Sequence, residues 1–184
     1  MTRGIRIDPA IVRGESSPVK AVRQAHLAFA EAVAAMSSLD PMTVELVRRR
    51  CARTHDCRVC QSIRYDSALQ AGVDESALAK VDHYEDSDFE ERTKVALRIT
   101  DAIIRRPGEM SEGLIAHARM HFSDEELIEL CLHIAKNSTQ KIGVALGTDM
   151  NTHPADERGL TFVSSSSSVS KATYAARPAS TTAN

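Results

Sequence analysis

The sequence predicts an all-α fold of about seven helices. Apolar residues recur at helical spacing along much of the 184-residue chain, and residues that cap helices stand in front of several of these segments. No run alternates convincingly with a period of two, apart from a short hint at 160–163. We therefore expect one helical domain over residues 19–150, an irregular segment before it (1–18) and a flexible tail after it (151–184).

The first two helices are predicted from apolar spacing and from a proline. Residues 19–36 place apolar side chains at helical intervals with many alanines between them, which predicts an amphipathic helix. Asp40 is a suitable N-cap, and Pro41 fits the first helical position, where its missing N–H costs nothing. The second helix runs into Arg48–Arg50, which we interpret as a solvated face.

A third helix is predicted around the cysteines. Asp56 is a reasonable N-cap for a helix that begins at Cys57, and Gly72 is a suitable residue to end it in the left-handed conformation. Asp74 can then cap a short helix that reaches Val81.

The second half of the chain carries two sets of capping signals. Ser87–Glu90 has capping-box spacing and opens a long helix that Pro107 and Gly108 close. Residues 110–121 follow as a further helix. Ser123–Glu126 is a second capping box, and it leads into a helix whose apolar spacing persists to Leu146.

The ends of the chain lack such patterns. Glycines and prolines interrupt residues 1–18, and the tail contains five consecutive serines, 164–168, followed by residues with little apolar surface to bury. The two ends are therefore not expected to contribute to the core.

Composition excludes several classes of partner. The formal net charge is −2 and tryptophan is absent, so neither nucleic acid nor an acidic membrane surface is an expected partner. No stretch approaches the roughly 20 apolar residues that a membrane-spanning helix needs, and the first residues lack a secretory apolar run. Three of the four cysteines are clustered, which in a reducing compartment is typical of catalytic or metal-binding sites. We expect a cytoplasmic protein.

Reactive chemistry concentrates in Arg49–Arg64, which contains Cys57-x-x-Cys60 among many basic residues. The thiolate is the reactive form of cysteine, and its pKa falls near cations and at helix N-termini, where Cys57 is expected to lie. Cys60 follows three residues later on roughly the same face, and this gap permits a disulfide. Arg64 is expected one helical turn beyond Cys60, where its charge could hold the Cys60 thiolate.

Glu45, eleven residues and then Cys57-x-x-Cys60 resemble the AhpD-like alkylhydroperoxidase and carboxymuconolactone decarboxylase superfamily. The segments Glu91–Leu97 and Phe122–Leu130 are similar to the second half of that superfamily, and the likeness covers roughly residues 20–150. The resemblance implies an AhpD-like helical domain, a homo-oligomer and no cofactor.

The resemblance also implies thiol peroxidase or disulfide oxidoreductase chemistry. Cys60 would attack a hydroperoxide and become a sulfenic acid, and Cys57 would resolve it to a disulfide. A dithiol or a disulfide reductase would then supply electrons. Glu45 would belong to the proton relay that activates Cys60.

One position departs from the family motif, because Arg64 stands where the relay histidine is expected. Arginine can stabilise a thiolate but cannot accept its proton near neutral pH. His55 could act instead from the other side, or Glu45 could act through water. The helix dipole favours Cys57 as the more acidic thiol, whereas the resemblance makes Cys60 the nucleophile.

Other interpretations of the same residues stay open. The arginine at the relay position suits a non-redox, decarboxylase-like or lactone-handling enzyme, or a binding module without catalysis. Cys51, His55, Cys57 and Cys60 could form a structural zinc site, although a single short segment rarely wraps a tetrahedron. Glu45 could simply pair with a neighbouring arginine. Cys51 and Cys131 are expected to be packing residues.

Overall fold

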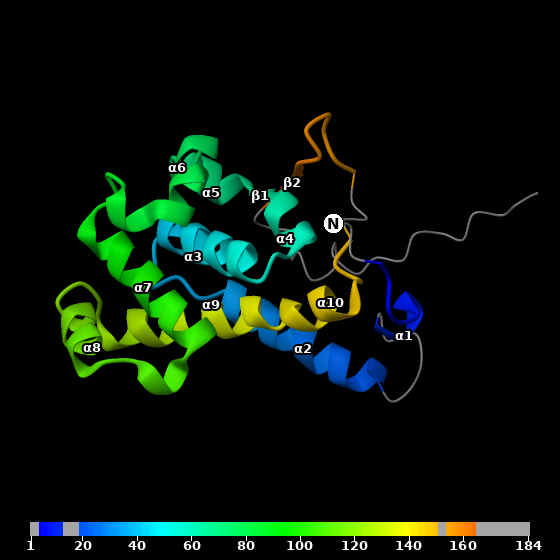
Figure 1. Cartoon of the computed structure of the whole chain (residues 1–184), viewed down its shortest axis with the longest axis horizontal. Helices are drawn as coiled ribbons and strands as arrows, with labels where there is room; N and C mark the ends of the chain where they lie inside the picture. Colours follow the sequence, from blue (N-terminus) through cyan, green and yellow to red (C-terminus); the bar gives the residue numbers. More distant parts are fainter. Residues whose placement is uncertain (1–3, 13–18, 151–153, 165–184) are drawn as a thin grey trace, which may run out of the picture.

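The computed structural model describes residues 4–12, 19–150 and 154–164, and it is mostly helical (Figure 1). The all-α prediction is thereby confirmed. The expected tail from residue 165 onward, with most of the serine run, lies outside the described residues, as do 1–3, 13–18 and 151–153.

The described residues form the following elements in chain order. They are α1 (Pro9–Val12), α2 (Val19–Ala34), α3 (Pro41–Thr54), α4 (Arg58–Ser62), β1 (Ile63–Tyr65), α5 (Asp66–Gln70), α6 (Glu75–Lys80), the 3₁₀ helix η1 (Val81–Asp86), α7 (Glu91–Arg105), the 3₁₀ helix η2 (Pro107–Glu109), α8 (Glu112–Arg119), α9 (Asp124–Ser138), α10 (Gln140–Leu146) and β2 (Thr161–Val163). Among the described residues, no helix is both long and apolar enough to cross a membrane.

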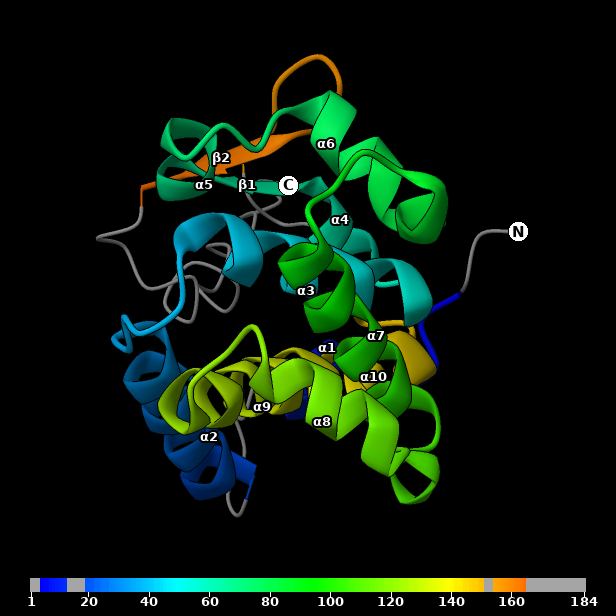
Figure 2. The ribbon, with the colours of Figure 1, turned by 90° about the vertical axis from the view of Figure 1, so that its left-hand side faces the viewer.

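Helix α3 is the central element, and it packs mainly on α7 and α9. Figures 1 and 2 place α5, α6 and the two strands on one side of α3, with α2 and α9 on the other. The core is mostly aliphatic and almost closed to solvent, and α3, α7 and α9 contribute many of its fully buried side chains: Leu46, Val47, Leu97, Ile99, Leu130 and Ile134. Burial of these side chains is the main driving force that holds the three helices together.

Several predicted caps are present. The carboxylate of Asp40 accepts a hydrogen bond from the Thr43 backbone N–H at 2.8 Å, and Pro41 is the first residue of α3. Asp74 caps α6 through the Ala77 N–H. Ser123 and Glu126 form the reciprocal capping box at the start of α9. These local signals satisfy N–H groups that would otherwise have no partner in the helix.

The other predicted capping box is wrong. Helix α7 begins at Glu91, and no side chain caps it. The hydroxyl of Ser87 instead donates to the Tyr84 carbonyl at 2.7 Å and accepts from the Phe89 N–H at 3.2 Å. The serine therefore stabilises the turn after η1, which competes with helix capping for the same short polar side chain.

The predicted continuous helix from Cys57 to Gly72 is also wrong. Cys57 itself is the N-cap of α4, Asp56 has a left-handed φ of 54°, and α4 ends at Ser62. The chain then extends as β1 before it turns into α5. Apolar spacing alone missed this break because a distant strand, not the local sequence, causes it.

That strand is β2, which pairs in parallel with β1 so that Ile63 lies opposite Thr161. Its side chains alternate between buried and exposed, in agreement with the hint of alternation at 160–163. The segment was predicted to belong to a flexible tail, so the structure corrects the prediction here. Val163 packs in a small apolar cluster with Cys57, Val59 and Ile63, which gives the strand a buried face.

Candidate functional site

The turn between α3 and α4 places the two cysteines of the CxxC motif beside α3. Asp56 adopts the left-handed conformation, and the Cys57 backbone N–H donates to the Ala52 carbonyl at 2.9 Å. The chain thereby folds back, so that α4 packs on α3. Aspartate tolerates this conformation better than most residues.

Cys57 and Cys60 are free thiols in different surroundings. Cys57 is fully buried, whereas Cys60 keeps part of its surface exposed. The Cys60 thiol donates a hydrogen bond to the Cys57 sulfur, which lowers the pKa of Cys57 although burial opposes this. The same hydrogen bond, together with burial, raises the pKa of Cys60. The pair therefore loses its first proton from Cys57, with the charge shared through the hydrogen bond.

Glu45 is not in direct contact with a sulfur but forms a buried ion pair with Arg48. The Arg48 guanidinium donates from Nε to Glu45 Oε2 at 2.7 Å and from Nη2 to Oε1 at 2.5 Å. It also donates to the Cys60 carbonyl at 2.6 Å and to the Ile63 carbonyl at 2.9 Å. Arg48 thus links Glu45 to the backbone of Cys60, the partly exposed cysteine. Its positive charge favours ionisation of both thiols, against the burial and hydrogen bonding that dominate at Cys60.

Arg64 does not lie one helical turn beyond Cys60, as expected, because α4 ends before it and Arg64 belongs to β1. Its guanidinium pairs with Glu75 at 2.6 and 3.0 Å and donates to the carbonyls of Gln61 and Ile63. All of these contacts are with oxygen atoms. Arg64 therefore acts on the backbone after Cys60, and not on its sulfur.

The end of α4 is surrounded by three guanidinium groups. Arg49 donates to the Gln61 carbonyl at 2.8 Å, beside the contacts of Arg48 and Arg64. Burial and the neighbouring arginines lower the pKa of Arg49 to about 10. The interpretation of Arg48–Arg50 as a solvated face is therefore wrong, since Arg48 and Arg50 are buried. The cations satisfy carbonyls at the C-terminal end of a short helix, where the dipole favours positive charge.

His55 lies apart from this network. Neither of its ring nitrogens forms a hydrogen bond with a described residue. Burial, and then the nearby Lys141, lowers its pKa to about 4, so the ring is neutral at pH 7. A base with so low a pKa would rarely accept the proton of a thiol.

Two residues near the thiols were missed by the sequence interpretation. Asp149, from the segment after α10, accepts hydrogen bonds from the backbone and side chain of Arg58 at the start of α4. Lys136, on α9, lies within electrostatic reach of Glu45 and Arg48, and burial followed by Arg48 lowers its pKa to about 8. No local pattern marked either residue, because Asp149 is 91 positions from Arg58 along the chain.

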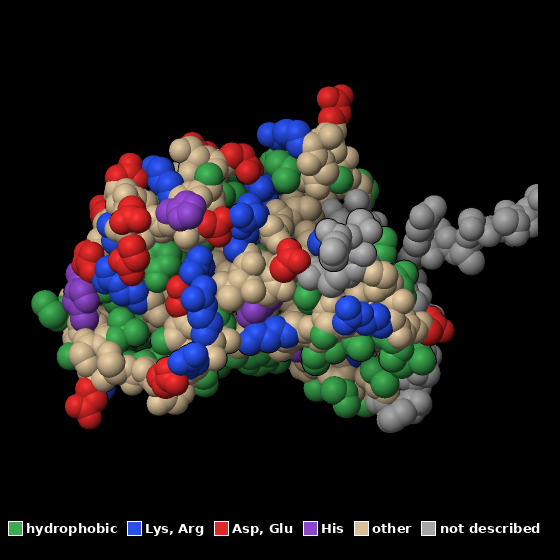
Figure 3. All heavy atoms as spheres, in the orientation of Figure 1, with side chains coloured by type: hydrophobic (Ala, Val, Ile, Leu, Met, Phe, Trp, Pro, Cys, Tyr) green, Lys and Arg blue, Asp and Glu red, His purple; other side chains and the backbone are tan. Residues whose placement is uncertain are grey.

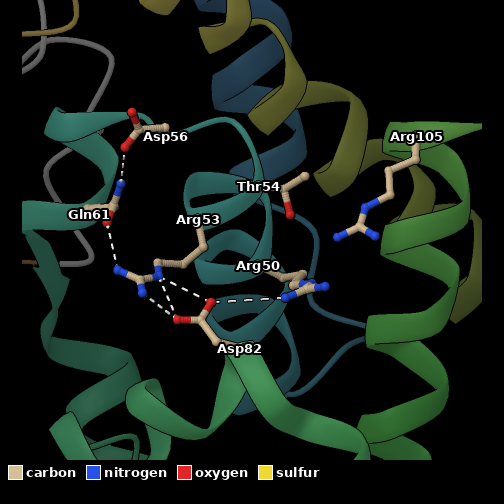
Figure 4. Close-up of a pocket in the computed structure, with 7 residues that line it drawn as sticks. All are labelled: Arg50, Arg53, Thr54, Asp56, Gln61, Asp82 and Arg105. Carbon is tan, nitrogen blue, oxygen red and sulfur yellow. Dashed lines mark hydrogen bonds and ion pairs between the residues drawn. The ribbon is translucent and has the colours of Figure 1, made fainter. Parts of the chain in front are cut away.

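A polar cavity of about 410 Å³ opens on the other side of Gln61 (Figure 4). Its lining consists of Arg50, Arg53, Thr54, Asp56, Gln61, Asp82 and Arg105. Asp82 lies between Arg50 and Arg53 and pairs with both, and Gln61 bridges Arg53 and Asp56. Neither Cys57 nor Cys60 lines this cavity.

The four residues considered for zinc do not form a ligand cluster. Within residues 4–12, 19–150 and 154–164, no three cysteine, histidine, aspartate or glutamate side chains gather closely enough to hold a metal ion. Burial also raises the pKa of Cys51 to about 12, which keeps it a thiol. The described geometry thus supports a thiol pair rather than a tetrahedral site.

No protein-family model matches the chain. Two uncharacterized proteins of Mycobacterium tuberculosis, Rv2313c and MT2376, are each 43% identical to it over 122 residues, which is 66% of this chain and 43% of theirs. The chain thus spans less than half the length of these relatives. The uncharacterized protein YdfG of Bacillus subtilis is 26% identical over 114 residues, which is 60% of this chain and 78% of that protein.

Among solved structures, the chain resembles ATU0492 from Agrobacterium tumefaciens, described as a protein of unknown function and suggested to be the antioxidant defence protein AhpD. The TM-score is 0.62 at 20% identity, and the match covers 83% of this chain and 100% of the other. At that identity the likeness shows the fold alone. The central three-helix packing, the CxxC helix folded back on α3 and this match together show that the chain has an AhpD-like fold.

Proposed function

We propose that the protein is a CxxC-dependent thiol peroxidase or disulfide oxidoreductase that reduces hydroperoxides. The observation that carries the proposal is the pair of free thiols at the start of α4, of which Cys57 is buried and Cys60 is partly exposed, with the lowered pKa on Cys57. A thiolate beside an accessible thiol is the starting state that peroxide reduction through a disulfide requires.

The pair can supply its own proton acceptor. In the proposed cycle the Cys60 proton passes to the Cys57 thiolate against the pKa order of the pair, so the attacking Cys60 thiolate is the minor form of the singly ionised pair. The Cys60 thiolate attacks the terminal oxygen of the hydroperoxide and the O–O bond breaks. The leaving alkoxide takes the proton held by Cys57 and departs as an alcohol. Cys60 is then a sulfenic acid and Cys57 is again a thiolate.

The second half of the cycle closes the disulfide. Cys57 attacks the Cys60 sulfur, the S–O bond breaks, and the released hydroxide takes a proton from solvent to form water. An external dithiol or disulfide reductase then returns two electrons by thiol–disulfide exchange and becomes oxidised itself. In this scheme Glu45 and Arg48 stabilise the backbone and the charge around Cys60, and the proton transfer does not require a histidine.

Counting thiols before and after one equivalent of an alkyl hydroperoxide tests the proposal. The wild-type protein should lose two thiols and 2 Da, with a Cys57–Cys60 disulfide in the peptide map. Cys60→Ser should lose none, and Cys57→Ser should accumulate a sulfenic acid that dimedone traps. Cys131→Ser is the matched control: burial raises the pKa of that thiol, so the variant, which starts with one thiol fewer, should still lose two. An unchanged thiol count in the wild-type protein would contradict the proposal.

A second candidate is a protein of the same fold without redox activity, either a decarboxylase-like enzyme or a binding module. Arg64 favours it, since the arginine at the relay position is engaged with Glu75 and with backbone carbonyls. Intact thiols after peroxide treatment would support this candidate.

We also propose that the protein is a homo-oligomer. Hydrophobic side chains gather on the surface over α2 (Figure 3), and both Val22 and Ile142 are well exposed. A second copy of the chain would bury such surface.

A further inference from the structure

The first turn of α4 is held by a carboxylate from a distant part of the chain. Asp149 Oδ2 accepts a hydrogen bond from the Arg58 backbone N–H at 3.0 Å, and Asp149 Oδ1 pairs with Arg58 Nη2 at 2.7 Å. The side chain of Asp149 is 1% exposed, whereas that of Arg58 is 36% exposed, so the carboxylate is buried and its partner reaches the surface. Cys57 is the N-cap residue but makes no side-chain cap bond. Asp149 therefore supplies the cap that Cys57 does not.

The same carboxylate is one of the charges that face Cys57. Three groups act on Cys57: Cys60 lies on α4, Arg48 on α3, and Asp149 in the segment after α10. Arg58, the next residue, completes this set and carries the opposite charge to its partner Asp149. An anion beside a thiol opposes its ionisation, and a cation favours it. A guanidinium beside the carboxylate therefore offsets part of its effect on the thiol.

We propose that Asp149 is a positioning residue for the Cys57–Cys60 pair, and that Arg58 is the cation that balances its charge. The inference rests on the proposed function in one respect, since it takes this pair as the reactive site. Asp149 fixes the start of the helix on which both cysteines lie. Asp149 and Arg58 also act on the first ionisation of the pair in opposite directions, although they are bonded to each other.

The test uses the opposite effects that Asp149 and Arg58 are expected to have on the first ionisation of the pair. In Asp149→Asn the amide oxygen can still accept from the Arg58 N–H, but the negative charge is gone. In Arg58→Gln the backbone cap remains and the compensating charge is lost. The first midpoint of the pair should fall by about 1 pH unit in Asp149→Asn and rise by a similar amount in Arg58→Gln. Thiolate absorbance at 240 nm, corrected with the Cys57→Ser/Cys60→Ser protein in the same background, measures this midpoint without peroxide.

Glu109→Gln is the matched control, because it removes an exposed carboxylate that pairs with Arg106. Its midpoint should equal that of the wild-type protein. A purely structural role of Asp149 would lower the melting temperature of both variants and leave both midpoints in place, and that result would overturn the inference. If Asp149→Asn does not fold, Arg58→Gln still decides the matter, because it keeps the cap. Peroxide inactivity with opposite midpoint shifts would reject the proposed function but not this inference.

Discussion

At the scale of single residues, the geometry of the site depends on which groups its arginines bind. Arg48 joins the Glu45 carboxylate to the Cys60 carbonyl, whereas Arg64 joins Glu75 to the carbonyls of Gln61 and Ile63. Both guanidinium groups use their several donors in a fixed fork, which suits them to satisfy carbonyls and carboxylates together. Neither one provides a base for a thiol.

Arg64→His should therefore not restore a proton relay. We expect peroxide turnover to stay within about two-fold of the wild-type value, while the free energy of unfolding falls by about 2 kcal/mol, since charge-assisted hydrogen bonds are lost. Peroxide assays and urea unfolding measure the two quantities. Arg106→Ala, in an exposed ion pair, is the control and should change neither. A rise in turnover of about 100-fold would show that a histidine here does act as a proton-transfer group.

At the scale of elements, the two-stranded sheet connects the end of the described chain to the segment that follows α4, the helix of the CxxC motif. Val163 on β2 is buried against Val59 and Ile63, and Phe162 on the opposite face is 49% exposed. The strand pairing holds β1 in an extended conformation directly after α4. The length of α4 is therefore set by a tertiary contact.

Val163→Asp should release β2, because it would bury an unpaired carboxylate in an apolar cluster. We expect faster amide hydrogen exchange at Ile63–Tyr65 and greater access of alkylating reagents to Cys57. The matched control is Phe162→Asp, which changes the exposed face of the same strand and should leave both measurements nearly unchanged. Equal effects of the two substitutions would contradict a specific role for the buried face.

At the scale of the whole molecule, buried histidines make stability depend on pH. Burial is the main cause that lowers the pKa of His133 to about 4, with Lys136 acting in the same direction and Glu129 against it. The folded state therefore holds fewer protons than the unfolded state between about pH 6.5 and 4. Stability contributed by the neutral ring is present at pH 7 and is lost as the pH falls through this window.

His133→Leu should remove part of that acid sensitivity. For the wild-type protein we expect His133 to contribute a loss of up to about 3 kcal/mol in unfolding free energy between pH 7 and pH 4. Denaturant unfolding at a series of pH values should show a flatter dependence in the variant. His83→Gln, at an exposed position in η1, should follow the wild-type curve. If the unfolding free energy of His133→Leu fell with pH as steeply as that of the wild-type protein, other groups would be the cause of the acid sensitivity.

The helices and several of their ends could be predicted because their signals are local. Asp40, Asp74 and Ser123 cap helices through N–H groups three residues away, and apolar spacing marks the faces that form the core. The same reasoning failed at Ser87, where a turn and a cap competed for one hydroxyl. It failed again after Ser62, because no local sequence pattern predicts the strand that begins there.

The sequence by itself determined the helical character of the chain and the position of the CxxC motif near a helix start, since both depend on contacts over a few residues. Only the tertiary structure decided which cysteine is buried, that Arg64 faces Glu75, and that Asp149 caps α4. The physical reason is the range of the interactions. Burial, ion pairing and the ionisation of thiols depend on neighbours that folding brings from distant parts of the chain. Local sequence patterns do not predict these neighbours.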